Sequence, residues 1–370
     1  MQPPTLSRPS SDLLHSVEHH QTSYTQSTRP SYPTSQANEM TIAKNVLITG
    51  AAGFVGQLLA KELLSDPKYT VTLTDVIEPP IPVGALHPEN ATVIKADLLK
   101  SASTVVHKSL DCIYIFHGIM SSGSEENFEL GFTVNVDSTR ALLDVVRLTV
   151  PGIRVVYASS QAVYGLPVPD VVDENVVPTP QSSYGSEKLI CEQLINDFTR
   201  KGFIDGFALR FPTISVRPGK PTAAASSFVS GMIREPLSGI ECVIPVQDRS
   251  LVSWICSPKT LVANLLYALT MPSDVLPKHI RFVNLPGIGV SIQDMMDALE
   301  KVAGPEVLEL LKEEDIPEVR AILYSWPQKF DNTRAYKMGF KPDQPFEETV
   351  RDHQQLLVKS KAKAVYGYTA

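Results

Sequence analysis

The sequence lacks several features that would define a specialised class of protein. Its four cysteines include no CxxC pair, and the closest two, Cys242 and Cys256, are 14 positions apart, so neither a zinc site nor a disulfide framework is indicated. No apolar run approaches the ~18 residues of a membrane span. Lys and Arg total 33 against 40 Asp and Glu, with no basic stripe for nucleic acid. We therefore expect a cytoplasmic protein with no metal, nucleic-acid or membrane partner.

The first 40 residues differ from the rest in composition. Ser, Thr, Pro and Gln supply 22 of them, and no helical or strand period appears. Such a segment buries too little apolar surface to offset its ordering entropy, so we predict a disordered tail over residues 1–40. The remaining chain is long enough to bury about three quarters of its unfolded surface.

Short apolar segments alternate with helical patterns from residue 44 onward. The predicted strands are 45–50, 70–75, 91–97, 112–117, 154–160 and 206–211, with helices through residue 64, over about 127–149 and over about 184–200. Near-continuous apolar strands separated by helices are typical of a parallel sheet covered on both faces. Because the connections are right-handed, we predict an α/β protein whose residues 41–211 form a doubly wound parallel sheet, the Rossmann fold.

The pattern changes after residue 211. Five prolines interrupt the segment 212–245, and helical patterns follow near 223–235, 257–271, 291–303 and 346–359. A strand-like run occupies 281–285. We therefore predict a smaller, mostly helical substrate lobe over 212–370, interleaved with returning strands of the main sheet.

Three glycines mark the end of the first predicted strand, where residues 49–56 read Thr-Gly-Ala-Ala-Gly-Phe-Val-Gly. Their spacing allows a tight turn, close backbone approach to a pyrophosphate and a helix N-terminus aimed at it. Asp75 follows 19 residues after Gly56, where an acid accepts from the ribose hydroxyls and repels a 2′-phosphate. The pattern predicts NAD rather than NADP; a structural turn and a surface aspartate are the alternative. The predicted cofactor contacts here are Gly50, Gly53, Phe54, Val55, Gly56 and Asp75.

Two further residues end strands at the same edge of the sheet. Asp97 either caps the next helix or accepts from the adenine amino group, with Leu98 beside it. His117 ends the fourth strand beside the predicted cofactor, where a histidine more often packs or supports than catalyses. We predict that Asp97, Leu98 and His117 all line the cofactor site.

Tyr184 and Lys188 share one face of a predicted helix that follows a strand ending in Ser159-Ser160. Oxidation of a secondary alcohol requires a base for the hydroxyl proton, and a phenol with a pKa near ~10 is a poor base at neutral pH. A lysine ammonium and the positive nicotinamide ring both favour the phenolate, while a serine hydroxyl orients the substrate oxygen. The alternative is a capping serine, a packed tyrosine and a surface lysine.

These motifs resemble the extended short-chain dehydrogenase/reductase family, of the NAD-dependent epimerase/dehydratase type. The resemblance covers nearly all of residues 44–360 and is carried by 49–56, by 159–165 (Ser-Ser-Gln-Ala-Val-Tyr-Gly) and by 180–188 (Pro-Gln-Ser-Ser-Tyr-Gly-Ser-Glu-Lys). It implies a catalytic set of Ser160, Tyr184 and Lys188, with Pro212 lining the nicotinamide. It also implies a homodimer formed through the Tyr–Lys helix and the long helix before it.

A narrower resemblance, to the D-erythronate dehydrogenase branch, is carried by residues 212–221, 223–228 and 233–237. It implies NAD-dependent oxidation of a secondary hydroxyl, the C2 hydroxyl of a four-carbon sugar acid. Such a carboxylate needs a cationic anchor and hydroxyl donors, although Arg217 would serve equally as an ordinary surface or interlobe ion pair. The candidate substrate contacts are Ser160, Tyr184, Thr213, Arg217, Ser226 and Ser227.

The chain departs from the family pattern after the fourth strand. His117 is followed by Gly-Ile-Met, where relatives carry Leu-Ala-Ala, so we expect Ile119 and Met120 to reshape the pocket. A nucleotide-sugar epimerase or dehydratase with tightly bound NAD is the main alternative function. A non-catalytic NAD-binding regulator is a weaker alternative, because the complete Ser–Tyr–Lys set would then be a coincidence.

Overall fold

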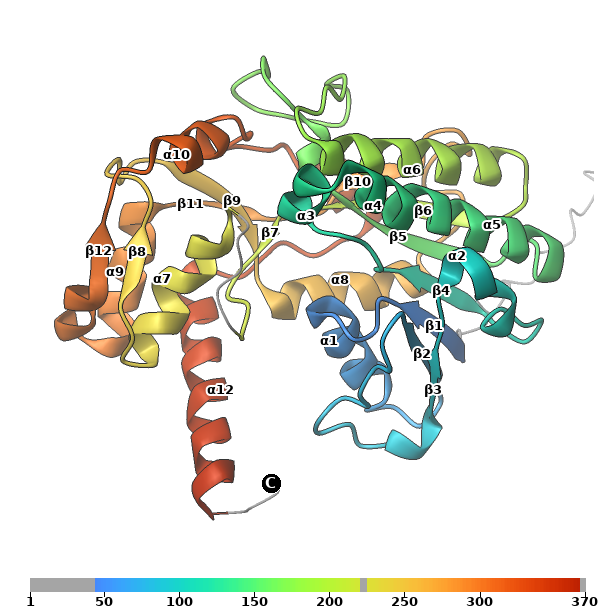
Figure 1. Ribbon diagram of the computed structural model, residues 1–370, viewed down its shortest axis with the longest axis horizontal. Coiled ribbons are helices and arrows are strands. Elements are labelled where there is room, and N and C mark those ends of the chain that lie inside the picture. The colour runs from blue at the N-terminus through green and yellow to red at the C-terminus, as the bar shows by residue number, and fades with distance from the viewer. Residues whose placement is uncertain (1–43, 220–224, 367–370) are drawn as a thin grey trace, which may run out of the picture. The chain divides into compact units, whose positions relative to one another are not determined.

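The computed structural model describes residues 44–219 and 225–366, and its central feature is a seven-stranded parallel sheet (Figure 1). The strand order is β10-β6-β5-β4-β1-β2-β3, and each neighbouring pair is parallel. The predicted doubly wound α/β fold is confirmed, whereas the predicted tail over 1–40 lies outside the described residues. The strands are β1 (Asn45–Thr49), β2 (Thr70–Asp75), β3 (Ala91–Lys95), β4 (Cys112–Ile115), β5 (Arg154–Ser160), β6 (Asp205–Phe211) and β10 (Phe282–Asn284).

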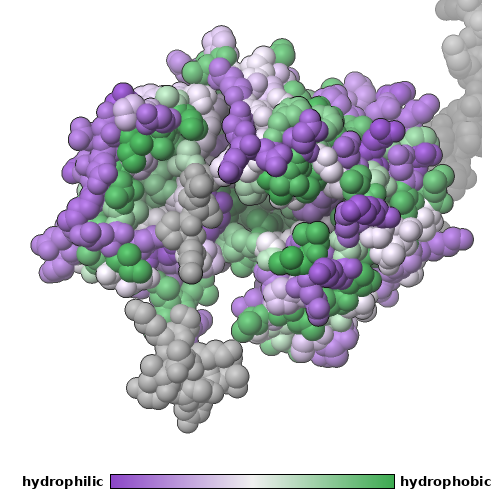
Figure 2. All heavy atoms as spheres, in the orientation of Figure 1, coloured by the Kyte–Doolittle hydropathy of each residue, from purple (hydrophilic) through white to green (hydrophobic). Residues whose placement is uncertain are grey.

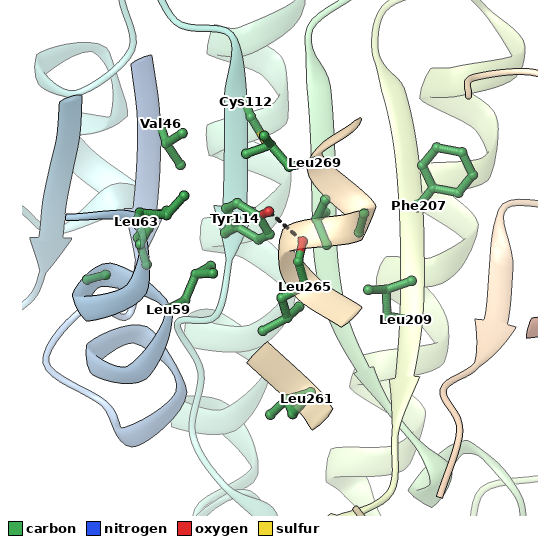
Figure 3. Close-up of a cluster of buried hydrophobic side chains, with 14 of the residues drawn as sticks. Val46, Leu59, Leu63, Cys112, Tyr114, Phe207, Leu209, Leu261, Leu265 and Leu269 are labelled. Carbon is green, nitrogen blue, oxygen red and sulfur yellow. Dashed lines mark hydrogen bonds between the residues drawn. The ribbon is translucent and has the colours of Figure 1, made fainter. Parts of the chain in front are cut away.

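Helices cover both faces of this sheet. One face packs against α1 (Phe54–Leu63) and α8 (Pro258–Thr270), as Figure 3 shows. There the Tyr114 hydroxyl donates to the Leu265 carbonyl at 2.7 Å, which joins β4 to α8. The other face packs against α2 (Leu98–Ser101), α5 (Ser138–Thr149) and α6 (Ser183–Arg200). Each fully buried leucine in these layers contributes about 1.5–3 kcal/mol of hydrophobic stabilisation.

The connection from β4 to β5 differs in detail from the single helix expected over 127–149. It contains α3 (Ser121–Glu126), α4 (Phe128–Phe132), a π-helical turn (Thr133–Asp137) and then α5. The π turn widens the helix by one residue, a geometry that is frequent at functional sites. Asn135 lies in this turn and is almost completely buried.

The C-terminal half contains its own hydrophobic cluster around α7 (Ser227–Leu237), α9 (Ile292–Ala303) and α12 (Phe346–Tyr366). The helices expected near 257–271, 291–303 and 346–359 are present, and the helix expected at 223–235 begins at Ser227 and continues past Pro236. The boundary predicted at residue 212 stays a prediction. Short elements complete this half: β7 (Thr213–Ile214), β8 (Cys242–Ile244), β9 (Val252–Cys256), β11 (Ile288–Ser291), β12 (Leu311–Glu313), α10 (Pro317–Tyr324) and α11 (Thr333–Met338).

These short strands form two small sheets, β11-β9-β7 and β12-β8, which the sequence did not predict. No helix in the described part of the chain is long and apolar enough to cross a membrane. All four cysteines are buried and unpaired.

A buried ion pair joins α6 to β6. The Arg210 guanidinium donates two hydrogen bonds to the Glu192 carboxylate, at 2.8 and 2.6 Å, and both side chains are at most 1% exposed. The Ser159 hydroxyl donates to the same carboxylate at 2.5 Å. Glu192 therefore holds α6 against the ends of β5 and β6.

We expect Glu192→Ala to lower the free energy of unfolding by about 3–5 kcal/mol, because it leaves a buried guanidinium without its carboxylate. Asp197→Ala is the matched control, since it removes an exposed pair with Arg200 on the same helix and should cost less than about 1 kcal/mol. Urea unfolding measures both values. Equal losses in the two variants would contradict the importance of the buried pair.

Candidate active site

A cavity of about 1210 Å³ opens at the carboxyl ends of the parallel strands. In Figure 2 the molecule is hollowed between the region of α1 and that of α7, with hydrophobic residues at the floor. This volume suits a dinucleotide together with a small substrate. The predicted residues that line it are Gly50, Gly53, Phe54, Val55, Gly56, Asp75, Asp97, Leu98, His117, Ser160, Tyr184, Lys188, Pro212, Thr213, Arg217 and Ser226, whereas Ser227 is not among them.

The glycine loop has the geometry that a dinucleotide requires. Gly50 has a φ of +66°, and a Cβ there would lie 2.5 Å from the backbone nitrogen of His117. A Cβ at Gly56 would lie 2.6 Å from the Gly50 carbonyl oxygen. In the described structure no side chain caps the N-terminus of α1 at Gly53, so its first N–H groups remain available for phosphate oxygens. The residues present therefore fit the cofactor predicted for this loop.

Two carboxylates line the cavity at the ends of β2 and β3, where the sequence predicts the adenosine. Asp75 accepts from the backbone N–H of Ala52 at 3.1 Å and from that of Val76 at 2.7 Å. These bonds fix the carboxylate at the end of β2 and leave lone pairs for two ribose hydroxyls. Asp97 caps α2 by accepting from the Leu99 N–H at 3.1 Å, so the capping interpretation holds while the residue still faces the cavity.

His117 lies between two hydroxyl groups at the end of β4. Its Nδ1 is 2.8 Å from the Thr49 Oγ1, and its Nε2 is 2.8 Å from the Ser138 Oγ. Desolvation lowers the pKa of His117 to about 3, and the charge of Lys188 acts in the same direction. The imidazole is therefore neutral at pH 7 and supports the cavity floor.

The first turn of α6 brings Tyr184 to Ser160. The Ser182 hydroxyl accepts from the Gly185 N–H at 3.1 Å and starts the helix. A Cβ at Gly185 would lie 2.2 Å from the Ala162 carbonyl oxygen, so only glycine lets this turn pack against the chain after β5. As a result, the Ser160 hydroxyl is close enough to Tyr184 to lower the pKa of its phenol.

Burial shifts the pKa values of Tyr184 and Lys188 in opposite directions. Burial raises the pKa of Tyr184 to about 12, against the hydrogen bond with Ser160. Burial lowers the pKa of Lys188 to about 8. The Lys188 ammonium donates to the Ala158 carbonyl at 2.9 Å and lies 5.4 Å from the centre of the Tyr184 ring. Without further positive charge, Tyr184 is therefore protonated at neutral pH.

The opposite end of the cavity contains a cation. Arg217 lines it and acts electrostatically on Tyr184, whose pKa it lowers. Its backbone is fixed, because its N–H donates to the Ser230 hydroxyl at 3.0 Å and its carbonyl accepts from Arg234 at 2.8 Å. Among residues 44–219 and 225–359, the Arg217 guanidinium has no carboxylate partner, unlike that of Arg234, which pairs with Glu235. The guanidinium is therefore available to an anionic ligand.

Sequence reasoning missed several residues of the substrate end. Gln161 lines the cavity and donates to the Thr213 hydroxyl at 3.2 Å. In the sequence it is marked only by its place in the 159–165 motif. An apolar wall comes from Val319, Ile322 and Trp326, at and after α10, for which the sequence offered no signal. In the described residues, no group of His, Cys, Asp and Glu side chains is arranged to hold a metal ion.

A doubly wound sheet, a glycine loop at its carboxyl edge and a Tyr–Lys pair in the same cavity define the class of dinucleotide-dependent oxidoreductases. Comparison with known proteins agrees. The chain is 38% identical over 314 residues to the D-erythronate dehydrogenase of Haemophilus influenzae, covering 83% of this chain and 97% of that enzyme. It is 40% identical over 323 residues to that of Cupriavidus necator, covering 84% and 98%.

A solved structure is also similar to this chain. The nucleoside-diphosphate-sugar epimerase from Agrobacterium tumefaciens is 35% identical and superposes with a TM-score of 0.79, over 85% of this chain and 95% of that one. The model of the NAD dependent epimerase/dehydratase family matches residues 46–280. The chain therefore belongs to this family, and NAD is its cofactor.

We expect Asp75→Ser to weaken NAD binding by about 1.5–3 kcal/mol, the value of a hydrogen bond to a charged group. The same change should reduce the difference in binding affinity between NAD and NADP, because a carboxylate no longer repels the 2′-phosphate. Asp97→Ser, which alters the other cavity carboxylate, should retain the preference for NAD. Titration of both cofactors against the three proteins checks this, and a wild-type preference for NADP would contradict it.

Proposed function

We propose that this enzyme oxidises a secondary hydroxyl of a small sugar acid, D-erythronate or a close analogue, with NAD as the oxidant. The observation that carries the proposal is Arg217, an unpaired guanidinium among the described residues that acts on Tyr184 from within the same cavity. A sugar-acid carboxylate needs such a cation, which binds it through two parallel N–H groups. Two relatives named D-erythronate dehydrogenase, each similar over most of this chain, support the assignment.

In this proposal Tyr184 is the base and Ser160 orients the substrate. Ser160 holds the substrate hydroxyl beside the Tyr184 oxygen, and Tyr184 accepts the proton as the carbonyl forms. NAD, when bound, accepts the two electrons and the hydrogen that leave the substrate carbon, and its positive ring favours the phenolate. Lys188 contributes further positive charge and holds the nicotinamide ribose. The overall reaction converts the hydroxy acid and NAD into a keto acid, NADH and one proton.

Arg217 sets which hydroxyl reacts. With the carboxylate held by its guanidinium, the neighbouring C2 hydroxyl is directed toward Tyr184, and the product is a 2-oxo acid. Thr213 and Ser226 line the same part of the cavity and supply hydroxyl groups for the remaining substrate oxygens. The apolar wall at α10 closes the substrate end and favours a short acid.

A nucleotide-sugar epimerase or dehydratase is the second candidate, favoured by the 35% identity to the Agrobacterium structure. Such an enzyme would use the same tyrosine, lysine and serine but would return the electrons to its substrate and release no NADH. A non-catalytic NAD-binding regulator is disfavoured, because Ser160, Tyr184 and Lys188 all line one cavity.

The test is incubation of the purified protein with NAD and either D-erythronate or nucleotide sugars. We expect NADH to form in proportion to D-erythronate consumed, and Arg217→Met to lower kcat/KM about 10- to 100-fold through loss of a charged hydrogen bond. Arg200→Met, a change of an exposed arginine on α6, is the control. Turnover of a nucleotide sugar without net NADH would overturn the proposal in favour of the epimerase.

We expect Tyr184→Phe to lower kcat by at least ~10²-fold, because it removes the proton acceptor while keeping the ring. The melting temperature should change little, since only one hydroxyl is lost. Tyr336→Phe, on the exposed face of α11, should leave turnover unchanged. Wild-type kcat in Tyr184→Phe would exclude the tyrosine as the base.

We further propose that the enzyme is a cytoplasmic homodimer. Phe128, Leu148 and Ile190 are exposed apolar residues on α4, α5 and α6, the elements through which the family resemblance implies pairing. Burial of such side chains between two copies is favourable. Four unpaired, buried cysteines agree with a reducing compartment.

A further inference from the structure

Glu187 is a buried carboxylate on the catalytic helix that the proposed chemistry does not use. It lies directly before Lys188 on α6 and is 1% exposed. Its Oε2 accepts from the Ser124 hydroxyl at 2.9 Å and from the Asn135 amide at 2.5 Å. A Cβ at Gly131 would lie 2.6 Å from its Oε1, so α4 leaves space for the carboxylate only because residue 131 is glycine.

Asn135 also forms hydrogen bonds to the backbone in the wall of the cavity. Its Oδ1 accepts from the Ile119 N–H at 2.7 Å, and its Nδ2 donates to the Ile119 carbonyl at 3.0 Å. Gly118, Ile119 and Met120 all line the cavity. One amide therefore holds both backbone groups of the residue at the centre of this loop.

The Glu187 carboxylate and the Ile119 backbone together fix which way the Asn135 amide faces. An ionised carboxylate only accepts hydrogen bonds, so Asn135 must present its NH₂ group toward Glu187. The amide oxygen is then directed to the Ile119 N–H, which is the orientation that holds the loop. Without Glu187, the amide keeps only its bonds to Ile119 and to the Ser124 hydroxyl, which accepts from its Nδ2 at 3.2 Å, and Asn135 is held less firmly in this orientation.

We propose that Glu187 is a positioning residue, which acts through Asn135 to hold the 118–120 loop in the shape that binds NAD and substrate. Burying a carboxylate with one oxygen lacking a hydrogen-bond partner, as is the case for Oε1 in the described structure, is costly. A purely structural contact at this place would be made at lower cost by a neutral side chain. For the substrate, the inference rests on the proposed function; for NAD, it rests on the family alone.

The charge of Glu187 has a second effect on the same helix. It raises the pKa of Tyr184, and it raises the pKa of Lys188 against the larger effect of burial. Cys191 and Glu192 act on Lys188 in the same direction, while Arg217 lowers the pKa of Tyr184. Removal of the Glu187 charge alone therefore lowers both pKa values and leaves these other groups in place.

The first experiment is calorimetric titration of NAD, which requires no turnover. Glu187→Ala removes the acceptor that orients Asn135, and we expect NAD affinity to fall about tenfold, the equivalent of one buried hydrogen bond. Glu187→Gln keeps an oxygen at the acceptor position and should bind NAD within about threefold of wild type.

Asn264→Ala is the matched control. Asn264 is a buried residue of α8 that holds both backbone groups of Lys341, at 2.8 and 3.1 Å, and it does not line the cavity. It should lower the melting temperature and leave NAD affinity unchanged. Wild-type NAD affinity in Glu187→Ala, with a loss of melting temperature like that of the control, would overturn the proposal.

The second experiment is the pH profile of kcat/KM for Glu187→Gln, which decides the matter if Glu187→Ala does not fold. Both limbs of the pH profile should move to lower pH than in wild type, because the pKa values of Tyr184 and Lys188 both fall. A profile that coincides with wild type would show that the carboxylate charge has no effect on the site. If D-erythronate is not oxidised at all, the proposed function fails while the NAD titration still decides the role of Glu187.

Discussion

β1 and β4 are parallel neighbours from which the chain continues in opposite directions along the sheet, to β2 and to β5. Because both connections are right-handed, the helices that follow these strands lie on opposite faces and leave a crevice at the carboxyl edge. The rest of the site depends on this divergence, because α1 leaves on one face and α3 to α5 on the other. Gly50, directly after β1, and His117, two residues after β4, approach so closely that a Cβ at Gly50 would collide with the His117 backbone. The glycine loop, the Asp75 carboxylate and the first turn of α6 then all face one cavity.

Burial shifts the pKa values of the titratable groups in this cavity, and charged ligands can shift them further. Desolvation disfavours the phenolate of Tyr184 and the ammonium of Lys188, so both groups favour their neutral forms more strongly than they would in water. Positive charge near Tyr184 opposes this effect, and Arg217 already supplies part of it. In the proposed mechanism, an anionic substrate and a positively charged nicotinamide would therefore have opposite electrostatic effects on Tyr184.

Local patterns predicted the sheet and most residues that line the cavity, because glycine spacing, strand ends and the Tyr–Lys interval are set by short stretches of chain. The confirmed doubly wound sheet follows from such signals. By contrast, β7 has two residues, β8 and β12 three each, and they pair with distant segments, so no periodicity marks them. The contact from Glu187 to Asn135 joins residues 52 positions apart, and only the folded chain brings them together. Ser227 was expected at the substrate but begins α7 outside the cavity lining.

The return of β10 and α8 to the main sheet has a consequence for how the chain acquires its structure. β10 completes one edge beside β6, and α8 supplies Leu261, Leu265 and Leu269 to a core that also contains residues of β1 and β4. A nascent chain that ends at residue 211 would therefore expose one apolar face of its sheet on the ribosome. Such long-range closure slows folding and ties the two halves into one cooperative unit.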